Sequence, residues 1–143
     1  MSTRLLIVDD DERICRMLGR YLIREGYQIS TASDGFSMWE TLKTYSPELI
    51  IMDIMLPCAD GITLTRELKE KNPVIGVIML TAKNDIIDTI LGLEVGADDY
   101  ITKPFDYRIL LARVNSVLRR MSYNAIDKNN IPSIDNSIQL SHD

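Results

Sequence analysis

The chain has 143 residues, of which 45% are hydrophobic and 26% charged, and its formal net charge is −5 at pH 7. This length suits one globular domain with a buried core, and the net charge argues against a broad surface for nucleic acid or anionic membrane. The longest apolar runs are too short to cross a bilayer, and acidic residues interrupt the start before a signal-peptide core can form. We therefore expect a cytoplasmic protein.

Five short apolar runs alternate with five amphipathic stretches along the chain. The apolar runs predict β-strands over residues 5–8, 28–32, 49–52, 76–80 and 100–102. The amphipathic stretches predict helices over residues 12–24, 36–44, 62–71, 86–95 and 107–121. A strand followed by a helix, five times at even spacing, predicts an α/β domain in which helices cover both faces of a five-stranded, parallel, doubly wound sheet.

The pattern changes after Met121. Residues 122–143 are rich in Ser and Asn and show no clear periodicity, with only scattered isoleucines. Such a composition is typical of a linker or tail. We therefore predict one folded domain over residues 1–121 and a linker or tail over residues 122–143.

Histidine and cysteine chemistry has little support in the sequence. The single histidine, His142, lies near the end of the predicted tail, and two cysteines are too few for a disulfide framework or a metal cluster. Cys15 falls among helix residues, where we expect a small packing group. Cys58 falls in the loop after the third strand, where a tolerated turn residue is a simpler interpretation than a redox or metal role.

Polar side chains stand where four of the predicted strands end. Asp9 and Asp10 follow the first strand, Asp53 ends the third, Thr81 the fourth and Lys103 the fifth. These ends share one edge of a parallel sheet, which is where open α/β proteins bind ligands. Three carboxylates that converge there repel one another, and Mg²⁺ or Mn²⁺ would offset that repulsion. The sequence therefore predicts an oxygen-rich cation site.

Lys103 and Thr81 would form the other half of an anion site. The ammonium group, the hydroxyl and the cation could together meet the oxygens of a phosphoryl group, with Asp53 as the nucleophile that becomes an aspartyl phosphate. Each residue also has a simpler structural interpretation: Asp53 as a cap or turn residue, Thr81 as a strand-end cap and Lys103 as a surface charge. Because all of them at one edge would require several coincidences, we favour the chemical interpretation.

Several sequence motifs point to one family. They are LLIVDDD near the start, IIMDIMLP with DG at 60–61, MLTA at 79–82 and GADDYITKPF at 96–105. On these motifs, residues 4–121 resemble the receiver domain of two-component response regulators. The resemblance implies a flavodoxin-like sheet with strand order 2-1-3-4-5, phosphorylation of Asp53 by the phosphohistidine of a sensor histidine kinase, and dependence on Mg²⁺.

The resemblance also implies a role for each site residue. Asp10, Asp53 and the carbonyl of Met55 would ligate the metal directly, and Asp9 would act through water. A receiver of this kind promotes its own phosphorylation and dephosphorylation but is not an enzyme acting on a separate substrate.

Three further residues match the part of the family pattern that senses the phosphoryl group. Lys103 would contact that group directly. Thr81 and Tyr100 would form a switch pair, in which the threonine moves to the phosphate and the tyrosine swings inward behind it.

GADDYITKPF, together with LLAR and LRR in the last predicted helix, resembles the winged-helix transcription-factor branch of the family. Receivers of that branch dimerise through helix four, strand five and helix five and carry a C-terminal DNA-binding domain. No such domain fits after residue 121, so the chain is expected to be either the receiver part of a regulator or a stand-alone receiver that works by protein–protein interaction.

Some positions depart from that branch. Thr89 and Ile109 stand where a basic and an acidic residue usually pair across the dimer, and Asn115 replaces a further basic residue. An ion pair between Arg113 and either Asp98 or Asp99 remains available. We therefore expect a dimer on the same face that is weaker or more apolar.

Other classes of protein share parts of this pattern. A phosphohydrolase of the haloacid-dehalogenase type also uses a strand-end Asp with Mg²⁺, but its D-x-D motif requires an acid where Met55 stands. A flavin or dinucleotide module requires a Gly- or Ser/Thr-rich loop after the first strand, where this chain has acidic residues at 9–12. An interaction domain that works without phosphate is the third alternative.

Overall fold

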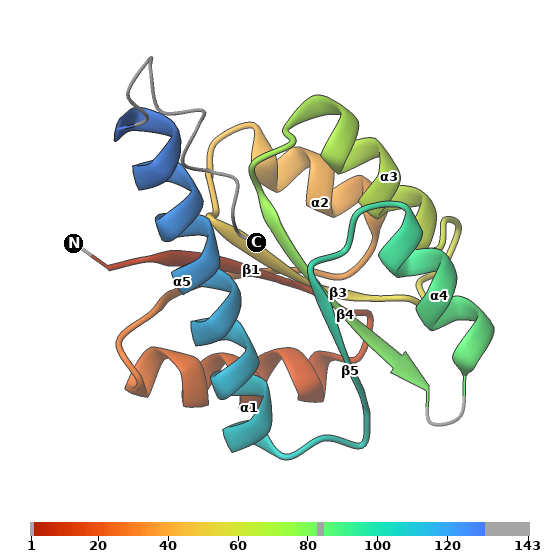
Figure 1. Ribbon diagram of the computed structural model, residues 1–143. Helices are drawn as coiled ribbons and strands as arrows, with labels where there is room; N and C mark the ends of the chain where they lie inside the picture. Colours follow the sequence, from red (N-terminus) through yellow and green to blue (C-terminus); the bar gives the residue numbers. More distant parts are fainter. Residues whose placement is uncertain (1, 83–84, 131–143) are drawn as a thin grey trace.

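The computed structural model describes residues 2–82 and 85–130 (Figure 1). Within them five strands alternate with five helices, as the sequence predicts. The strands are β1 (Arg4–Val8), β2 (Gln28–Ala32), β3 (Leu49–Asp53), β4 (Gly76–Ala82) and β5 (Asp99–Lys103). The helices are α1 (Glu12–Arg24), α2 (Gly35–Leu42), α3 (Gly61–Lys71), α4 (Ile86–Glu94) and α5 (Tyr107–Asn130).

The strands form one parallel sheet in the order β2-β1-β3-β4-β5. This order confirms the predicted doubly wound, flavodoxin-like fold. The chain reverses its direction across the sheet between β1 and β3, so helices lie on both faces. Helices α1 and α5 cover one face, and α2, α3 and α4 cover the other (Figure 1).

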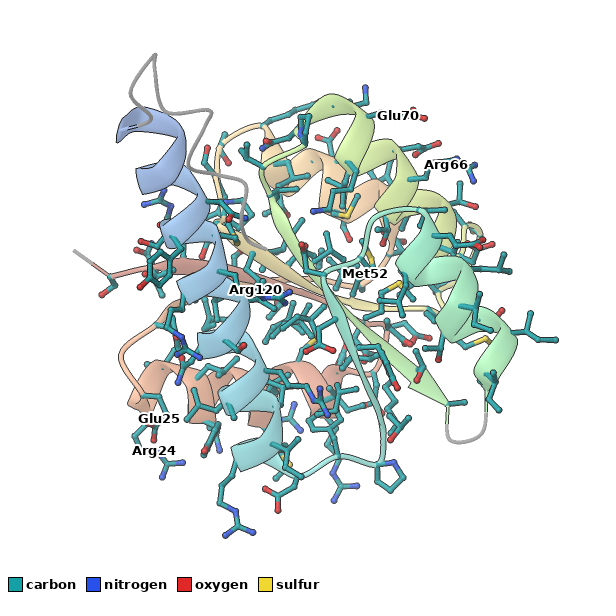
Figure 2. All side chains as sticks on the ribbon, in the orientation of Figure 1. Arg24, Glu25, Met52, Arg66, Glu70 and Arg120 are labelled. Carbon is teal, nitrogen blue, oxygen red and sulfur yellow. The ribbon has the colours of Figure 1, made fainter. Side chains whose placement is uncertain are left out.

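Alternate residues of the central strands point into two separate cores. Leu6 and Ile50 belong to the core under α2 and α3, whereas Leu5 and Ile51 belong to the core under α1 and α5, and all four are fully buried. Because both faces of β1 and β3 are covered, these strands need unbroken apolar runs. Met52, in the first core, lies near the middle of the molecule (Figure 2). The strand ends that carry the polar residues are therefore held by a close-packed interior.

Aspartates mark the starts of four helices. The side chains of Asp11, Asp34, Asp60 and Asp85 accept hydrogen bonds from backbone N–H groups in the first turn of α1, α2, α3 and α4, respectively. A carboxylate at this position satisfies N–H groups that have no partner inside the helix. These caps fix the loops that follow β1, β2 and β3.

The last helix is longer than predicted. Helix α5 runs to Asn130, whereas the periodicity predicts an end near Met121, so the first part of the predicted tail is helical. No glycine or proline stands between Met121 and Pro132, and the sequence therefore holds no strong stop signal there. The rest of the predicted tail, residues 131–143 with His142, lies outside the described residues.

Candidate functional site

The carboxyl ends of β1, β3, β4 and β5 border one open cavity of about 560 Å³. Its lining residues are Asp9, Asp10, Asp11, Asp53, Met55, Thr81, Ala82 and Lys103. The structure therefore brings together every predicted site residue except Tyr100. Parallel strands deliver these residues to one edge because consecutive strands end at the same side of the sheet.

Three carboxylates converge in this cavity. Oxygen atoms of Asp9, Asp10 and Asp53 all lie within 4.8 Å of one another. Asp10 is exposed, but Asp9 and Asp53 are only 1% and 3% exposed. Burying like charges at this separation is unfavourable unless a cation compensates them.

Lys103 supplies part of that compensation. Its Nζ lies 3.0 Å from Oδ2 of Asp9 and 3.3 Å from Oδ2 of Asp53. Burial on its own lowers the pKa of Lys103, but the close contacts with Asp9 and Asp53 outweigh it and the pKa is raised. The lysine is therefore charged at neutral pH, and one ammonium group faces three carboxylates.

Backbone N–H groups hold the second oxygen of each buried carboxylate. Oδ1 of Asp9 accepts a hydrogen bond from the N–H of Asp11 at 2.9 Å, and Oδ1 of Asp53 accepts one from the N–H of Met55 at 3.1 Å. Each donor lies two residues after its acceptor, so the turn that leaves each strand also orients its carboxylate. The Oδ2 atoms are left for Lys103 and for a ligand.

The carboxyl group of Asp53 is hard to ionise in this setting. Burial and the charge of Asp9 raise its pKa to about 6, although the Met55 N–H and Lys103 act in the opposite direction. An additional cation beside Asp53 would favour the ionised form, which is the form that can act as a nucleophile.

Two buried oxygens lack hydrogen-bond partners among the described residues. They are Oδ2 of Asp9, whose contact with Lys103 is an ion pair by distance only, and Oγ1 of Thr81. Unsatisfied buried oxygens are rare in proteins, and here they border a cavity that also contains three carboxylates. The carboxylates of this cavity carry more negative charge than Lys103 compensates, and all the potential ligand atoms are oxygens. Such a site fits a hard divalent cation such as Mg²⁺.

Tyr100 lies outside the cavity, on β5. The register pairs Met79 with Tyr100 and Thr81 with Thr102, so Thr81 and Tyr100 are diagonal neighbours on the same face of the sheet. That face is the one covered by α4. The tyrosine is 37% exposed and does not line the cavity.

Gly61 contributes to the site in a way that the sequence analysis did not recognise. A Cβ atom at this position would overlap the carbonyl oxygen of Asp53, and the Gly61 N–H donates a hydrogen bond to the Ile54 carbonyl at 2.8 Å. The first residue of α3 is thus packed directly against the end of β3. The DG motif at 60–61 was the available signal, because it places a helix cap before a residue without a side chain.

Exposed apolar side chains cover α4 and the nearby part of β5 and α5. The large exposed hydrophobic residues of this face are Ile86, Ile87, Ile90, Leu91, Leu93, Tyr100 and Ile109. Thr89 uses its hydroxyl locally, donating to the Asp85 carbonyl at 2.9 Å. This face is therefore mostly apolar where the sequence departs from the charged pattern of the family branch.

The charged groups considered for the same face have partners within the chain. Arg113 lies 3.3 Å from Asp99, whereas Asp98 pairs with Lys69 at 2.9 Å and accepts the Val77 N–H. Of the two acids that the sequence offers to Arg113, Asp99 is the one in contact. A hydrogen bond from the Tyr27 hydroxyl also engages the remaining substituted position, Asn115.

Comparison with known proteins gives a consistent result. A family profile described as the response regulator receiver domain matches residues 5–115. The chain is 46% identical, over 120 residues, to the alkaline phosphatase synthesis transcriptional regulatory protein PhoP of Bacillus subtilis, covering 84% of this chain and 50% of that protein. It thus spans about half the length of this relative.

Solved structures agree with the family profile. The receiver domain of the TMAO respiratory system response regulator TorR superposes with a TM-score of 0.79 at 40% identity, covering 83% of this chain and 98% of that one. A CheY-like response regulator receiver domain protein from Methanospirillum hungatei gives a TM-score of 0.82 at 29% identity, covering 87% and 99%. Among the described residues, no helix is long and apolar enough to cross a membrane.

Proposed function

The chain belongs to the response regulator receiver domain family of two-component signalling, and on that premise we propose that Asp53 accepts a phosphoryl group from the phosphohistidine of a sensor histidine kinase. The observation that carries this assignment is the position of Asp53. It is buried at the end of β3, in the same cavity as two other aspartates and 3.3 Å from Lys103. A carboxylate in this environment is held in one orientation and is short of positive charge.

In the proposed reaction a carboxylate oxygen of Asp53 attacks the phosphorus atom. The new P–O bond forms as the bond from phosphorus to the histidine nitrogen breaks, and the electron pair of that bond stays on the imidazole. Asp53 must be ionised for this step, so the ammonium group of Lys103 also helps by favouring the carboxylate.

The acidic residues would hold a divalent cation, Mg²⁺ or Mn²⁺. Asp10, Asp53 and the Met55 carbonyl would ligate it directly and Asp9 through water, which would relieve the mutual repulsion of the three carboxylates. When bound, the cation supplies neutralisation of the phosphoryl oxygens. The Lys103 ammonium would then contact one of these oxygens, because its Nζ already lies beside Asp53.

The unsatisfied hydroxyl of Thr81 would detect the product. A phosphoryl oxygen on Asp53 would provide the hydrogen-bond acceptor that the hydroxyl lacks among the described residues. Movement of Thr81 toward the phosphate would vacate space on the face that it shares with Tyr100, and the tyrosine would turn inward. The change would thereby reach α4.

The output is a dimer formed through α4, β5 and α5. The exposed isoleucines of α4 and Ile109 of α5 support an apolar contact on this face, and dimerisation would control transcription through a DNA-binding domain outside this chain. Sedimentation with and without acetyl phosphate tests this step. A phosphorylated chain that stays monomeric at high concentration would contradict it.

The phosphoacceptor role is tested by incubating the chain with Mg²⁺ and acetyl phosphate and recording its intact mass. We expect a labile gain of one phosphoryl group, no gain in Asp53→Asn, and no gain when EDTA removes the metal. Labelling of the Asp53→Asn variant would place the acceptor elsewhere. Repeated hydrolysis of a phosphomonoester by the chain would instead indicate a phosphohydrolase.

A further inference from the structure

A second, smaller cavity of about 190 Å³ lies between α2 and α3, which are neighbours on one face of the sheet (Figure 1). Among its lining residues, Pro47 stands just before β3 and Ile75 directly before β4. The cavity therefore lies at the amino ends of these strands, at the opposite edge of the sheet from Asp53. We call it the α2–α3 pocket. It shares no lining residue with the acceptor cavity.

The inner wall of the α2–α3 pocket is apolar and fixed by the fold. Leu68 and Ile75 line it, are only 2% and 4% exposed, and belong to the core on this face of the sheet. Tyr45, also in the wall, donates a hydrogen bond from its hydroxyl to the Leu5 carbonyl at 2.8 Å, which ties the loop after α2 to β1. A cavity whose walls are already in place needs little reorganisation when a ligand enters.

An aromatic ring and an ammonium group meet in this pocket. Trp39 of α2 and Lys71 of α3 both line it, and Nζ of Lys71 lies over the indole ring, 5.5 Å from the ring centroid. Lys71 is exposed and forms no ion pair with any residue of the described chain. Its contact with the ring is therefore a weak one that an anion can replace or share.

The polar groups of the pocket favour a negatively charged ligand. Ser46 and Asn72 add a hydroxyl and an amide to Lys71, and no aspartate or glutamate is among the lining residues. The nearest acid in the sequence, Glu48, accepts a hydrogen bond from the Arg4 N–H at 3.0 Å and pairs with its guanidinium group at 3.5 Å. A carboxylate at the pocket would thus meet donors and positive charge without an opposing uncompensated carboxylate in the wall.

We propose that the α2–α3 pocket is a second ligand site, which binds a small aromatic carboxylate. The ring of the ligand packs between Trp39 and Leu68, and its carboxylate stays at the surface beside Lys71. Because pockets for drug-sized ligands have volumes of about 300 Å³ or more, this smaller pocket suits a single ring with a short acidic side chain. The proposal does not depend on the phosphoacceptor role of Asp53, since the two cavities are separate.

A partner protein fits this region less well than a small molecule does. The exposed residues that adjoin the lining residues in the sequence are charged: Glu40, Lys43 and Glu70, the last near the end of α3 (Figure 2). A stable protein interface buries about 800 Å² on each partner around an apolar centre. Here the apolar atoms lie inside a cavity that holds one ring, with charged residues beside it.

Trp39 provides a direct measurement, because it is the only tryptophan of the chain. The probe is phenylacetate, and the comparison ligand is phenylacetamide, which keeps the ring and removes the charge. Both are titrated at constant ionic strength while tryptophan fluorescence is recorded. We expect a saturable change with a Kd of about 1 mM or below for phenylacetate, and at least about fivefold weaker binding of phenylacetamide. Acetate, which has no ring, should cause no change.

Variants locate the charge preference at one lysine. Lys71→Gln should bind phenylacetate and phenylacetamide equally, with little change in its affinity for the amide. Lys43→Gln is the matched control, because Lys43 is an exposed lysine at the end of α2 that pairs with Glu40 at 2.8 Å and does not line the pocket. This control should retain the preference of the wild type. Thermal denaturation is the second readout: phenylacetate should raise the Tm of the wild type more than phenylacetamide does at the same concentration.

Three results would overturn the proposal. The first is the absence of any saturable fluorescence change with phenylacetate, and the second is equal affinity of the wild type for phenylacetate and phenylacetamide. The third is a charge preference that persists in Lys71→Gln, since the carboxylate would then bind elsewhere. Binding of the uncharged N-acetylphenylalanine amide as tightly as phenylacetate would also reject it, and would identify the pocket as an anchor point for an aromatic side chain of a partner protein.

Discussion

The aspartates that begin helices and the aspartates that end strands lie close together in the sequence but have opposite environments. Asp34, at the start of α2, has its pKa lowered by the backbone N–H and the hydroxyl of Ser37. Asp53, at the end of β3, has its pKa raised to about 6 by burial and by Asp9. Asp34 therefore stabilises the fold as a carboxylate, whereas the ionised form of Asp53 is unfavourable unless a cation compensates it.

This contrast shows which carboxylates of the fold can gain from binding a ligand. A cap carboxylate already has its hydrogen-bond donors, so it gains little from a ligand. A strand-end carboxylate in the cavity shares one ammonium group with another carboxylate, and Oδ2 of Asp9 has no hydrogen-bond donor among the described residues. A cation or a phosphoryl group that supplies the missing partners would therefore bind more favourably at the strand-end carboxylates than at the caps.

The largest effect is expected at Gly61, which follows the cap residue Asp60 and packs against the backbone of the strand-end residue Asp53. Gly61→Ala places a Cβ against the Asp53 carbonyl oxygen, directly after the cap Asp60, so β3 and α3 must separate. We expect a loss of about 3 kcal/mol in the free energy of unfolding, measured by urea denaturation, and slower phosphorylation of Asp53 by acetyl phosphate.

Gly19→Ala is the matched control for this prediction. Gly19 lies within α1, and its Cβ would lie 3.6 Å from the Ile29 side chain, an ordinary contact distance. Alanine there should stabilise the chain by about 0.5–1 kcal/mol. If Gly61→Ala were equally harmless, the close approach of α3 to β3 would not constrain the site.

Substitution of Asp53 should raise the free energy of unfolding, whereas substitution of a buried polar residue usually lowers it. Without metal, Asp53→Asn removes a charge that the fold opposes, so the variant should be more stable than the wild type at neutral pH by up to about 3 kcal/mol. The measurement is urea denaturation in EDTA. Addition of Mg²⁺ should stabilise the wild type more than the variant, because the variant lacks one carboxylate of the cation site.

The pH dependence gives the sign of this effect. The folded-state pKa of Asp53, about 6, lies above the unfolded value near 4, so the folded state binds the extra proton between these values. The contribution of Asp53 to stability is therefore fully present below about pH 4 and is lost as the pH rises through 6. The advantage of Asp53→Asn should grow over the same window. A constant difference across it would refute the raised pKa.

A cap aspartate should give the opposite result. Asp60→Ala removes the carboxylate that accepts the Thr63 N–H at 2.7 Å, and we expect a loss of about 1 kcal/mol in the free energy of unfolding. Asp60→Asn should retain most of the stability, because its amide oxygen can accept the same hydrogen bond. Both variants are measured in EDTA beside Asp53→Asn. Stabilisation by Asp60→Ala would remove the distinction between the two kinds of aspartate.

The sequence was sufficient for the fold and for the residues gathered at the site because both follow from the order of strands. Unbroken apolar runs end at Asp9 and Asp53, and parallel strands bring such ends to one edge. The end of α5 was predicted too early because loss of apolar periodicity does not stop a helix. The pairing of Asp98 with Lys69 was not predictable, since it joins a residue of α3 to the residue directly before β5, which only the tertiary fold brings together.

The smallest effect concerns the loop that joins a strand-end aspartate to a cap aspartate. Cys58 lies between Asp53 and Asp60 and adopts a left-handed backbone conformation, with φ of 71°. A residue with a Cβ is strained there by about 1 kcal/mol, whereas glycine is not but loses more conformational freedom on folding. Cys58→Gly should therefore stabilise the chain by a few tenths of a kcal/mol, and Cys58→Ser, which keeps the Cβ, should not.

Because the Cys58 side chain is exposed and does not line the acceptor cavity, phosphorylation of Asp53 by acetyl phosphate should be equally fast in all three proteins. A slower reaction in the serine variant would mean that the thiol itself contributes to the site, and the interpretation of Cys58 as a tolerated turn residue would then be wrong.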